Sequence, residues 1–365
     1  RSRNDMNLGI AGRPGSGKTT LFHALGGPHR PKAPQSPTDE RVVASIEVPD
    51  PRLEWLRELE KPRKYTPARL EFVDLPGLPT KDVRGKAELV GSLREVDGLL
   101  VVVRAFETDA YPYEDGAGDP LAEIRGLKDE FLLADYTVLA KRVEKLRDQV
   151  KKPTKTREKD EHELHLLEKI LGDVEQHSIS VREAVEKHWH AGADDALLRS
   201  YAFLSQKPIV LVVNCAEGRE KTPAVAEALK AYPTSLAVNA AIEEEIEALD
   251  ESDRAAFLAD FGISEPARGR LLRAAYASLG LASFFTSGED EVRAWTIRAG
   301  DDAVTAAGKI HSDLARGFIR AEVTPWETLH AAGSWRESKA RNATRLEGKD
   351  YRVKDGDVLN VRFAV

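Results

Sequence analysis

The sequence predicts an α/β protein built on a mostly parallel sheet, with a helical insertion and a small C-terminal sheet domain. Short apolar runs alternate with helical patterns at 7–106 and again at 208–280, and such alternation is typical of α/β architecture. A region with heptad spacing interrupts the alternation, and from about residue 282 alternating strands surround one helical pattern. The expected parts are a sheet domain at 6–126 and 206–281, an arm at 127–205 and a C-terminal domain at 282–365.

The main sheet is expected to contain five strands. The runs at 98–106 and 208–214 are apolar almost throughout, as is usual for strands that helices cover on both faces of a parallel sheet. The other runs are shorter, and each is followed by a turn or a helical pattern. The five runs lie at 7–12, 70–77, 98–106, 208–214 and 234–240.

Two heptad patterns predict an antiparallel coiled-coil arm. One seam runs from Leu132 to Val150 and a second from Leu164 to Val185, with Ser178 at one of its positions. Pro153 lies between them and breaks the helix, so the two helices must fold back on each other. Residues 141–160 contain nine Lys or Arg against four Asp or Glu. This basic tip is either a solvated hairpin or a docking surface for RNA or another acidic partner.

The last part of the chain predicts a small α+β domain. Alternating strands are expected at 292–300 and 357–365, with a helix at 303–318 between them. Three tryptophans lie in this domain, at positions 295, 326 and 335. Packing is their expected role, and stacking on RNA is the alternative.

Composition limits the class of protein. The formal net charge of -7 argues against a globally basic nucleic-acid binder, and no DNA specificity is evident. The one cysteine, Cys215, excludes internal disulfides and fits a reducing compartment. No apolar run approaches the roughly 20 residues of a membrane span, and residues 1–5, which precede Met6, carry no apolar leader. We therefore expect a cytoplasmic protein without membrane contact.

Residues 12–19, GRPGSGKT, match the phosphate-binding pattern G-x-x-x-x-G-K-[ST] between a predicted strand and a predicted helix. Glycines such as Gly12 allow backbone N–H groups to surround an anion, and the helix N-terminus adds partial positive charge. Lys18 is expected to reach the outer phosphates and to act in catalysis, and the Thr19 hydroxyl is expected to ligate Mg²⁺.

A second motif, DLPG at 74–77, ends another predicted strand. Behind a phosphate loop, Asp74 is expected to hold the magnesium ion through water, and the Gly77 N–H to reach the γ-phosphate, which gives it a catalytic role. Leu78 follows, where many switch GTPases carry the glutamine that orients the attacking water. Because leucine cannot do this, hydrolysis must use another group or be slow.

The stretch VVNCAEG at 212–218 has the position of a base-reading motif. Asn214 fits the Asn-Lys-x-Asp pattern of guanine sites, but Cys215 replaces the lysine and Glu217 the aspartate. The extra methylene of Glu217 keeps its carboxylate from the aspartate position without a backbone or rotamer shift. The motif therefore loses a guanine preference on physical grounds, and it does not by itself create a preference for adenine.

Together these features resemble the YchF family, a branch of the Obg-like GTPases. The resemblance covers essentially the whole chain, and its most specific stretch is C-terminal, LEGKDYRVKDGDVLNVRFAV at 346–365. It implies a P-loop G domain of the TRAFAC class, a coiled-coil arm, and a TGS domain with a ubiquitin-like β-grasp fold. It also implies Mg²⁺-dependent binding of ATP in preference to GTP, slow hydrolysis and association with ribosomes.

The resemblance also assigns residues by position. Thr38 stands where the family's first switch loop supplies a second magnesium-linked threonine. Asn214, Cys215 and Glu217 stand at the family's Asn-x-x-Glu motif. The residues that would wrap the phosphates are Gly15, Ser16, Gly17, Lys18, Thr19 and Thr20, and those of the second base loop are Ala240 and Ala241.

Three departures from the family concern the γ-phosphate. Gly15 replaces a usual asparagine that can help bind potassium in related GTPases, and Tyr113 stands where the family has a proposed catalytic histidine. Tyrosine, with a pKa near 10, is a poor base at neutral pH. The second switch is also poor in glycine.

The main hypothesis is thus an ATP-preferring switch; the alternatives are a nucleotide-sensing module with little hydrolysis, and a conventional GTPase.

Overall fold

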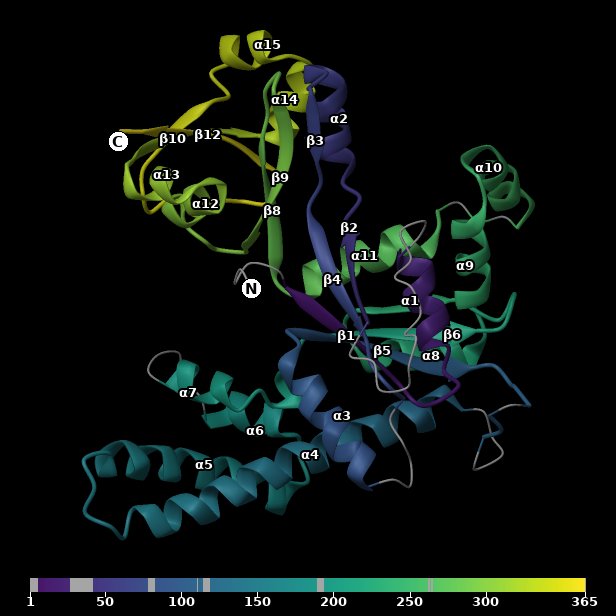
Figure 1. The fold of residues 1–365 in the computed structure, drawn as a ribbon, viewed down its shortest axis with the longest axis vertical. Helices are drawn as coiled ribbons and strands as arrows, with labels where there is room; N and C mark the ends of the chain where they lie inside the picture. Colours follow the sequence, from purple (N-terminus) through teal and green to yellow (C-terminus); the bar gives the residue numbers. More distant parts are fainter. Residues whose placement is uncertain are drawn as a thin grey trace. The chain divides into compact units, whose positions relative to one another are not determined.

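The computed structural model describes residues 6–26, 42–77, 83–109, 111–113, 119–188, 194–261, 263 and 265–364 (Figure 1). The chain forms two compact units. We name them the P-loop unit, which comprises Met6–Val43 and Phe72–Leu249, and the C-terminal unit, which comprises Arg1–Asp5, Ala44–Glu71 and Asp250–Val365. The division into three domains that the sequence suggests stays a prediction.

One six-stranded sheet has the order β2-β4-β1-β5-β6-β7, and its strands β1, β5, β6 and β7 lie wholly in the P-loop unit. Strand β1 pairs with β5, β5 with β6, and β6 with β7, all in parallel. Strands β5 and β6 are buried along nearly their whole length. The five predicted strands and the α/β class are therefore confirmed, and β2 is a sixth strand that the sequence analysis did not predict. The strands are β1 (Asn7–Ala11), β2 (Val42–Glu47), β4 (Arg69–Asp74), β5 (Gly98–Ala105), β6 (Ile209–Cys215) and β7 (Ser235–Val238).

Helices cover both faces of this sheet. On one side, α1 (Lys18–Gly26) packs against α9 (Ala240–Ala248). On the other side, Leu99, Val101 and Val103 of β5 join an apolar cluster with the helices α3 (Val83–Glu95), α4 (Pro120–Gln149) and α8 (Pro223–Ala228). Because side chains alternate across a strand, burial on both faces requires the unbroken apolar run that marks β5 in the sequence.

Helix α4 is both a sheet-covering helix and the first helix of the arm (Figure 1). Near its start, Leu127 and Phe131 lie in the cluster under the sheet, and further along, Leu139 and Val143 lie in a second cluster with α5. The helices α4 and α5 thus form the predicted hairpin. The other helical segments are α5 (Arg157–His177), α6 (Val181–His188), α7 (Asp194–Ser200), η2 (Leu204–Gln206) and η3 (Leu229–Ala231).

The second heptad seam does not continue as predicted. Helix α5 ends at His177, and the C-cap residue that follows it, Ser178, has a left-handed φ of 51°. A new helix starts at once, because Ser180 Oγ accepts from the Glu183 N–H at 3.2 Å while Glu183 Oε2 accepts from the Ser180 N–H at 2.8 Å. The prediction of one helix from 164 to 185 was therefore wrong: this capping box and the left-handed turn start α6 separately.

The C-terminal unit contains a second six-stranded sheet, in the order β11-β10-β12-β8-β9-β3. Strands β8 and β9 form an antiparallel hairpin, and the last strand, β12, lies parallel to β8. Helix α12 (Ala303–Ile310) covers one face, which is the β-grasp arrangement expected from the sequence. The strands are β3 (Lys64–Thr66), β8 (Leu281–Thr286), β9 (Glu291–Arg298), β10 (Phe318–Pro325), β11 (Arg345–Glu347) and β12 (Asp357–Phe363).

The helix predicted at 303–318 is in fact two helices. His311 is extended, with φ −163° and ψ 144°, and its side chain caps the next helix by accepting from the Asp313 N–H at 3.1 Å. None of the described helices is long and apolar enough to cross a membrane. The remaining helices of this unit are α2 (Pro51–Glu60), α10 (Glu251–Asp260), α11 (Ala267–Ser278), α13 (Ser312–Arg316), α14 (Trp326–Ala332) and α15 (Trp335–Ala340).

Candidate nucleotide site

The loop between β1 and α1 has the shape of an anion cradle. Gly15 and Gly17 have left-handed φ angles of 75° and 84°, which turn successive N–H groups inward and are costly for other residues. The Ser16 N–H closes the turn on the Arg13 oxygen at 3.2 Å, and Lys18 Nζ donates to the same oxygen at 3.1 Å. The lysine thus folds back over the loop, where a phosphate chain would lie.

Lys18 is held in a poorly solvated position. Its side chain is buried, and this burial lowers the pKa of the ammonium. The nearby carboxylates of Asp74 and Glu123 act in the opposite direction and raise that pKa. Among the described residues no carboxylate forms a salt bridge with Lys18, so a phosphate would be a strongly favourable partner for this buried cation.

Thr19 and Asp74, the two residues that the sequence analysis expects to hold Mg²⁺, are in direct contact. Thr19 Oγ1 donates to Asp74 Oδ2 at 3.1 Å. The second carboxylate oxygen, Oδ1, is buried and has no hydrogen-bond partner within the part of the chain that the structure describes. Burial raises the pKa of Asp74, and the Thr19 hydrogen bond and the Lys18 charge oppose this. A hydroxyl, a carboxylate and an orphaned buried oxygen fit a hydrated Mg²⁺. Thr38 lies outside the described residues.

Gly77 follows β4 and lies against the phosphate loop. A Cβ added at Gly77 would lie 2.9 Å from the backbone nitrogen of Pro14. The two predicted phosphate-contacting segments are therefore adjacent in the fold. Leu78, where a water-orienting glutamine stands in many GTPases, lies outside the described residues.

Asn214 connects the phosphate loop to the second base loop. Its Nδ2 donates to the Ser16 oxygen at 3.0 Å, and its Oδ1 accepts from the Ala240 N–H at 3.0 Å. Asn239 then caps α9 by accepting from the N–H groups of Ala241 and Ile242 at 3.1 Å each. Three of the predicted residues, Ser16, Asn214 and Ala240, are thus joined by direct hydrogen bonds.

Cys215 and Glu217 have different surroundings from Asn214. Cys215 ends β6 in the core, and burial raises the pKa of its thiol to about 12, so the thiol is inert near neutral pH. Glu217 is exposed in the following turn. Its carboxylate is accessible to a base that enters from solvent, and its role in base selection stays a prediction.

Glu123 and Arg104 are part of the site, although sequence reasoning did not select them. Glu123, in the first turn of α4, is buried, and its Oε2 accepts from the Arg104 N–H at 2.9 Å. Burial raises the pKa of Glu123, against the charges of Arg13, Arg104 and Lys18. The available signal was a charged residue directly after the apolar run of β5, which lies next to β1.

Tyr113 is a structural anchor here. Its hydroxyl lies 3.1 Å from the Arg104 oxygen and 3.0 Å from the Phe106 oxygen, and the Arg104 guanidinium sits 3.8 Å from the centre of its ring. Burial raises the pKa of Tyr113 further. A hydroxyl engaged with backbone carbonyls in this way is not available as a base.

Tyr111 explains the glycine at position 15. A Cβ built on Gly15 would lie 2.6 Å from Cγ of Tyr111 and 2.7 Å from its Cβ. The backbone oxygen of Tyr111 in turn accepts a hydrogen bond from the Arg104 guanidinium. The tyrosine ring therefore fills the space that a side chain at position 15 would need, and about half of its surface remains exposed.

Family models match both parts of the chain. A model described as a 50S ribosome-binding GTPase matches residues 7–133. A model for the C-terminal domain of YchF GTPases, described as a protein of unknown function, matches residues 281–364.

Relatives that match the whole chain point to the same family as these two models. The chain is 37% identical to the ribosome-binding ATPase YchF of Haemophilus influenzae, over 99% of this chain and 99% of that protein. It is 31% identical to Obg-like ATPase 1 of Homo sapiens, over 100% of this chain and 93% of that protein. The solved structure of the Schizosaccharomyces pombe YchF GTPase matches with a TM-score of 0.82 at 27% identity, over 99% of both chains. The chain therefore belongs to the YchF family of P-loop NTPases.

Proposed function

We propose that this protein is a nucleotide-dependent switch that binds ATP in preference to GTP, hydrolyses it slowly and associates with ribosomes. The observation that carries the nucleotide part is the joined set of Ser16, Asn214 and Ala240 beside the Thr19–Asp74 hydrogen bond. Such a set connects the phosphate loop, the metal position and the base loop. The names of the relatives, ribosome-binding ATPases, support the partner and the reaction.

The proposed phosphate site uses the cradle directly. The backbone N–H groups at 15–20 and the Lys18 ammonium would bind the phosphate oxygens, and the N-terminus of α1 adds its partial charge. Thr19 and Asp74 would hold Mg²⁺, with Thr38 as a proposed further ligand. The ion, when bound, neutralises charge on the phosphates. The Gly77 N–H would contact the γ-phosphate and report its presence to the chain that follows.

The proposed preference for ATP over GTP is supported by the names of the relatives. Glu217 and Cys215 remove the lysine and aspartate that guanine sites use, and several relatives are named ATPases. Isothermal calorimetry with Mg·ATP and Mg·GTP tests this: we expect ATP to bind several-fold more tightly. Equal or reversed affinities would exclude the assignment of the base. Lys18→Ala should abolish binding of both nucleotides, and retained binding would exclude the phosphate site itself.

The arm and the C-terminal TGS domain are the proposed contacts to ribosomes or structured RNA. Residues 151–159 at the tip of the arm are all exposed. Lys151 pairs with Asp148. Lys152 and Lys155, two other basic residues of the tip, are available to the phosphates of an RNA backbone. A cytoplasmic location follows from this proposal.

One observation favours a second candidate, a nucleotide-sensing module with little hydrolysis. Tyr113 stands where relatives have a proposed catalytic histidine, and its hydroxyl is engaged with the backbone oxygens of Arg104 and Phe106. Phosphate release measured with and without ribosomes separates the two candidates. Turnover stimulated by ribosomes supports the switch ATPase, and background turnover in both conditions supports the sensing module.

A further inference from the structure

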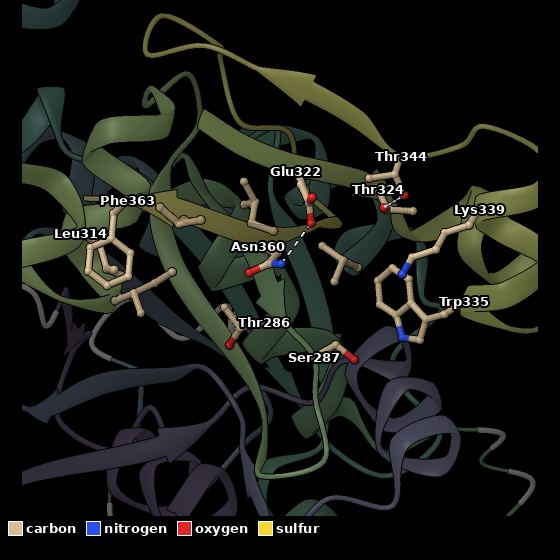
Figure 2. Close-up of a pocket in the computed structure, with 14 residues that line it drawn as sticks. Thr286, Ser287, Leu314, Glu322, Thr324, Trp335, Lys339, Thr344, Asn360 and Phe363 are labelled. Atoms are coloured by element: carbon tan, nitrogen blue, oxygen red, sulfur yellow. Dashed lines mark hydrogen bonds between the residues drawn. The ribbon is translucent and has the colours of Figure 1, made fainter. Parts of the chain in front are cut away.

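A groove of about 480 Å³ in the C-terminal unit is lined by none of the residues of the candidate nucleotide site (Figure 2). Strands β8, β10 and β12 and helices α13 and α15 contribute its walls. Its volume is in the range of sites that hold small ligands or short peptide segments.

The groove follows a strand edge. Strand β12 pairs with β10 from Asp357 to Phe363, but its pairing with β8 is confined to Val358 opposite Phe285. Strand β8 ends at Thr286, so β12 continues past it. Among the described residues, the positions 360–363 have a strand neighbour on one side only. The free edge is roughly 13 Å long, from four residues at about 3.3 Å each.

The lining residues confirm that the groove lies along this edge. Leu359, Asn360 and Val361 all line it, although successive side chains of a strand point to opposite faces. A pocket on one face alone would be lined by every second residue. The backbone edge of β12 is therefore part of the groove wall, and it offers N–H and C=O groups that a second strand can pair with.

The two ends of the groove differ in chemistry. At one end, Leu314 and Phe363 form an apolar site, and the Phe363 side chain is 44% exposed (Figure 2). At the other end, α15 contributes Trp335 and Lys339. The Trp335 indole N–H donates to the carboxylate of Glu60, which also accepts from Ser287 at 3.0 Å, so the ring is held in place.

The charged groups of the groove leave one cation available. Glu322 on the floor is paired with Arg362 and accepts from Asn360 Nδ2 at 3.0 Å (Figure 2). These contacts, the Arg362 hydrogen bond first, lower the pKa of Glu322. Lys339 is exposed and forms no salt bridge among the described residues, although its charge also contributes to the lowered pKa of Glu322. An acidic group of a ligand is the complementary partner for this ammonium.

We propose that this groove binds an extended segment of a partner protein, which pairs with the free edge of β12 as an added strand. The segment would set an apolar side chain against Leu314 and Phe363 and an acidic side chain against Lys339. Strand addition of this kind draws affinity from main-chain hydrogen bonds and specificity from alternate side chains. The proposal goes beyond the nucleotide function and does not depend on it.

A nucleic-acid strand fits the same groove less well. Lys339 is the cation and Glu322 the acid among the lining residues, so the wall has no excess positive charge for a phosphodiester backbone. The edge of the Trp335 ring that carries its N–H is also engaged by Glu60. These observations favour a peptide over a stack of unpaired bases.

The test begins with selection of peptides on the full chain. A displayed library of random nonapeptides is selected on the wild-type protein, with counter-selection on Phe363→Arg. Enriched peptides should alternate apolar and polar residues and contain an acidic position. Failure to enrich any sequence over the counter-selected pool would overturn the proposal.

Binding of an enriched peptide is then measured by fluorescence anisotropy. Lys339→Glu should weaken binding by about tenfold or more, and exchange of the peptide's acidic residue for lysine should restore it. N-methylation of alternate peptide residues should abolish binding in one register and spare it in the other, because only every second N–H faces the edge. Equal effects in both registers would exclude strand pairing.

Matched controls address folding and other occupants. Ile319→Arg places the same charge on a 53% exposed residue of β10 that does not line the groove, and it should bind the peptide as the wild type does. Displacement of the peptide by an oligouridine strand would assign the groove to RNA. A change in oligomeric state specific to Phe363→Arg would assign it to a second copy of the chain. Either result would overturn the proposal.

Discussion

The side-chain amide of Asn214 donates a 3.0 Å hydrogen bond to the backbone oxygen of Ser16, although the two residues are 198 positions apart. The same amide accepts from the Ala240 N–H, so one side chain orients the phosphate loop and the start of α9. Gly17 is part of this contact, because a Cβ there would collide with Asn214 Nδ2. The connection from the phosphate loop to the start of α9, the expected base loop, therefore exists in the protein fold itself.

Asn214→Asp should separate the two halves of this bridge. Aspartate can still accept from Ala240, but it cannot donate to Ser16 and sets a charge beside a carbonyl oxygen. We expect a loss of about 1–3 kcal/mol in the free energy of unfolding and about tenfold or more in nucleotide affinity. Urea unfolding and calorimetry measure the two.

A helix cap in the other unit is the control for this variant. Asp302→Ala removes the cap of α12 and should cost about 1 kcal/mol of stability while nucleotide affinity is unchanged. If Asn214→Asp lost stability and kept its affinity, the bridge would be structural only.

Asp74→Asn should change stability in a pH-dependent way. Burial raises the pKa of Asp74 in the folded protein, so the charged carboxylate costs stability above that raised value. The cost disappears as pH falls below the unfolded pKa of about 3.9. Without Mg²⁺ and nucleotide, the variant should therefore be more stable than wild type at pH 7, and the difference should vanish near pH 3.

Thermal unfolding with and without Mg²⁺ completes this prediction. Added Mg²⁺ and nucleotide should raise the midpoint of the wild type by several degrees more than nucleotide alone, and the variant should lack this increment. A variant that keeps the full magnesium increment would exclude Asp74 from the metal site.

Gly15→Asn should be costly in this chain because of Tyr111. The Tyr111 ring occupies the space a side chain would need, so we expect a loss of about 2 kcal/mol or more of stability. In the double variant with Tyr111→Gly this cost should fall, because glycine removes both the ring and the Cβ of residue 111 and asparagine tolerates the left-handed φ of 75°. A double-mutant cycle of unfolding free energies measures the coupling, and additive effects would contradict the proposed clash.

Asp135→Ala should destabilise the root of the arm. Asp135 is fully buried, accepts from the N–H groups of Leu204 and Ser205 at 2.8 and 2.9 Å, and pairs with Arg94 at 3.3 Å. Removal of the carboxylate leaves the Arg94 guanidinium without this ion-pair partner. We expect the free energy of unfolding, measured in urea, to fall by about 3–5 kcal/mol.

An exposed ion pair on the same arm provides the comparison. Glu168→Ala breaks the ion pair between Glu168, whose side chain is 39% exposed, and Arg147, whose side chain is 59% exposed. The variant should lose less than about 1 kcal/mol in the free energy of unfolding. Similar costs for the two variants would show that Asp135 is not a buried anchor.

Much of the fold could be predicted from local pattern. The unbroken apolar run of β5 required burial on both faces, and the glycines at 12–17 predicted a tightly turned loop between β1 and α1. The C-terminal strands around α12 were also recoverable. Two helix boundaries were missed, at Ser178 and His311, because a heptad or amphipathic pattern does not reveal a left-handed or extended residue within it.

Only the tertiary structure could identify the partners of the site residues. Nothing in the sequence near Tyr111 shows that its ring lies on Gly15, or that Tyr113 is bound to backbone oxygens. Glu123 is one acidic residue among many until α4 buries it beside Arg104. The open edge of β12 likewise depends on where β8 ends.

The sequence by itself determined five strands of the main sheet, the phosphate-loop motif and the family, because each depends on residues close together in the chain or on a pattern repeated along it. The tertiary structure decided which side chains are engaged and which remain available, as with Tyr113 and Lys339. The physical reason is that burial, hydrogen-bond pairing and steric overlap arise between residues that are distant in sequence, such as Ser16 and Asn214, and the chain expresses them only when it is folded.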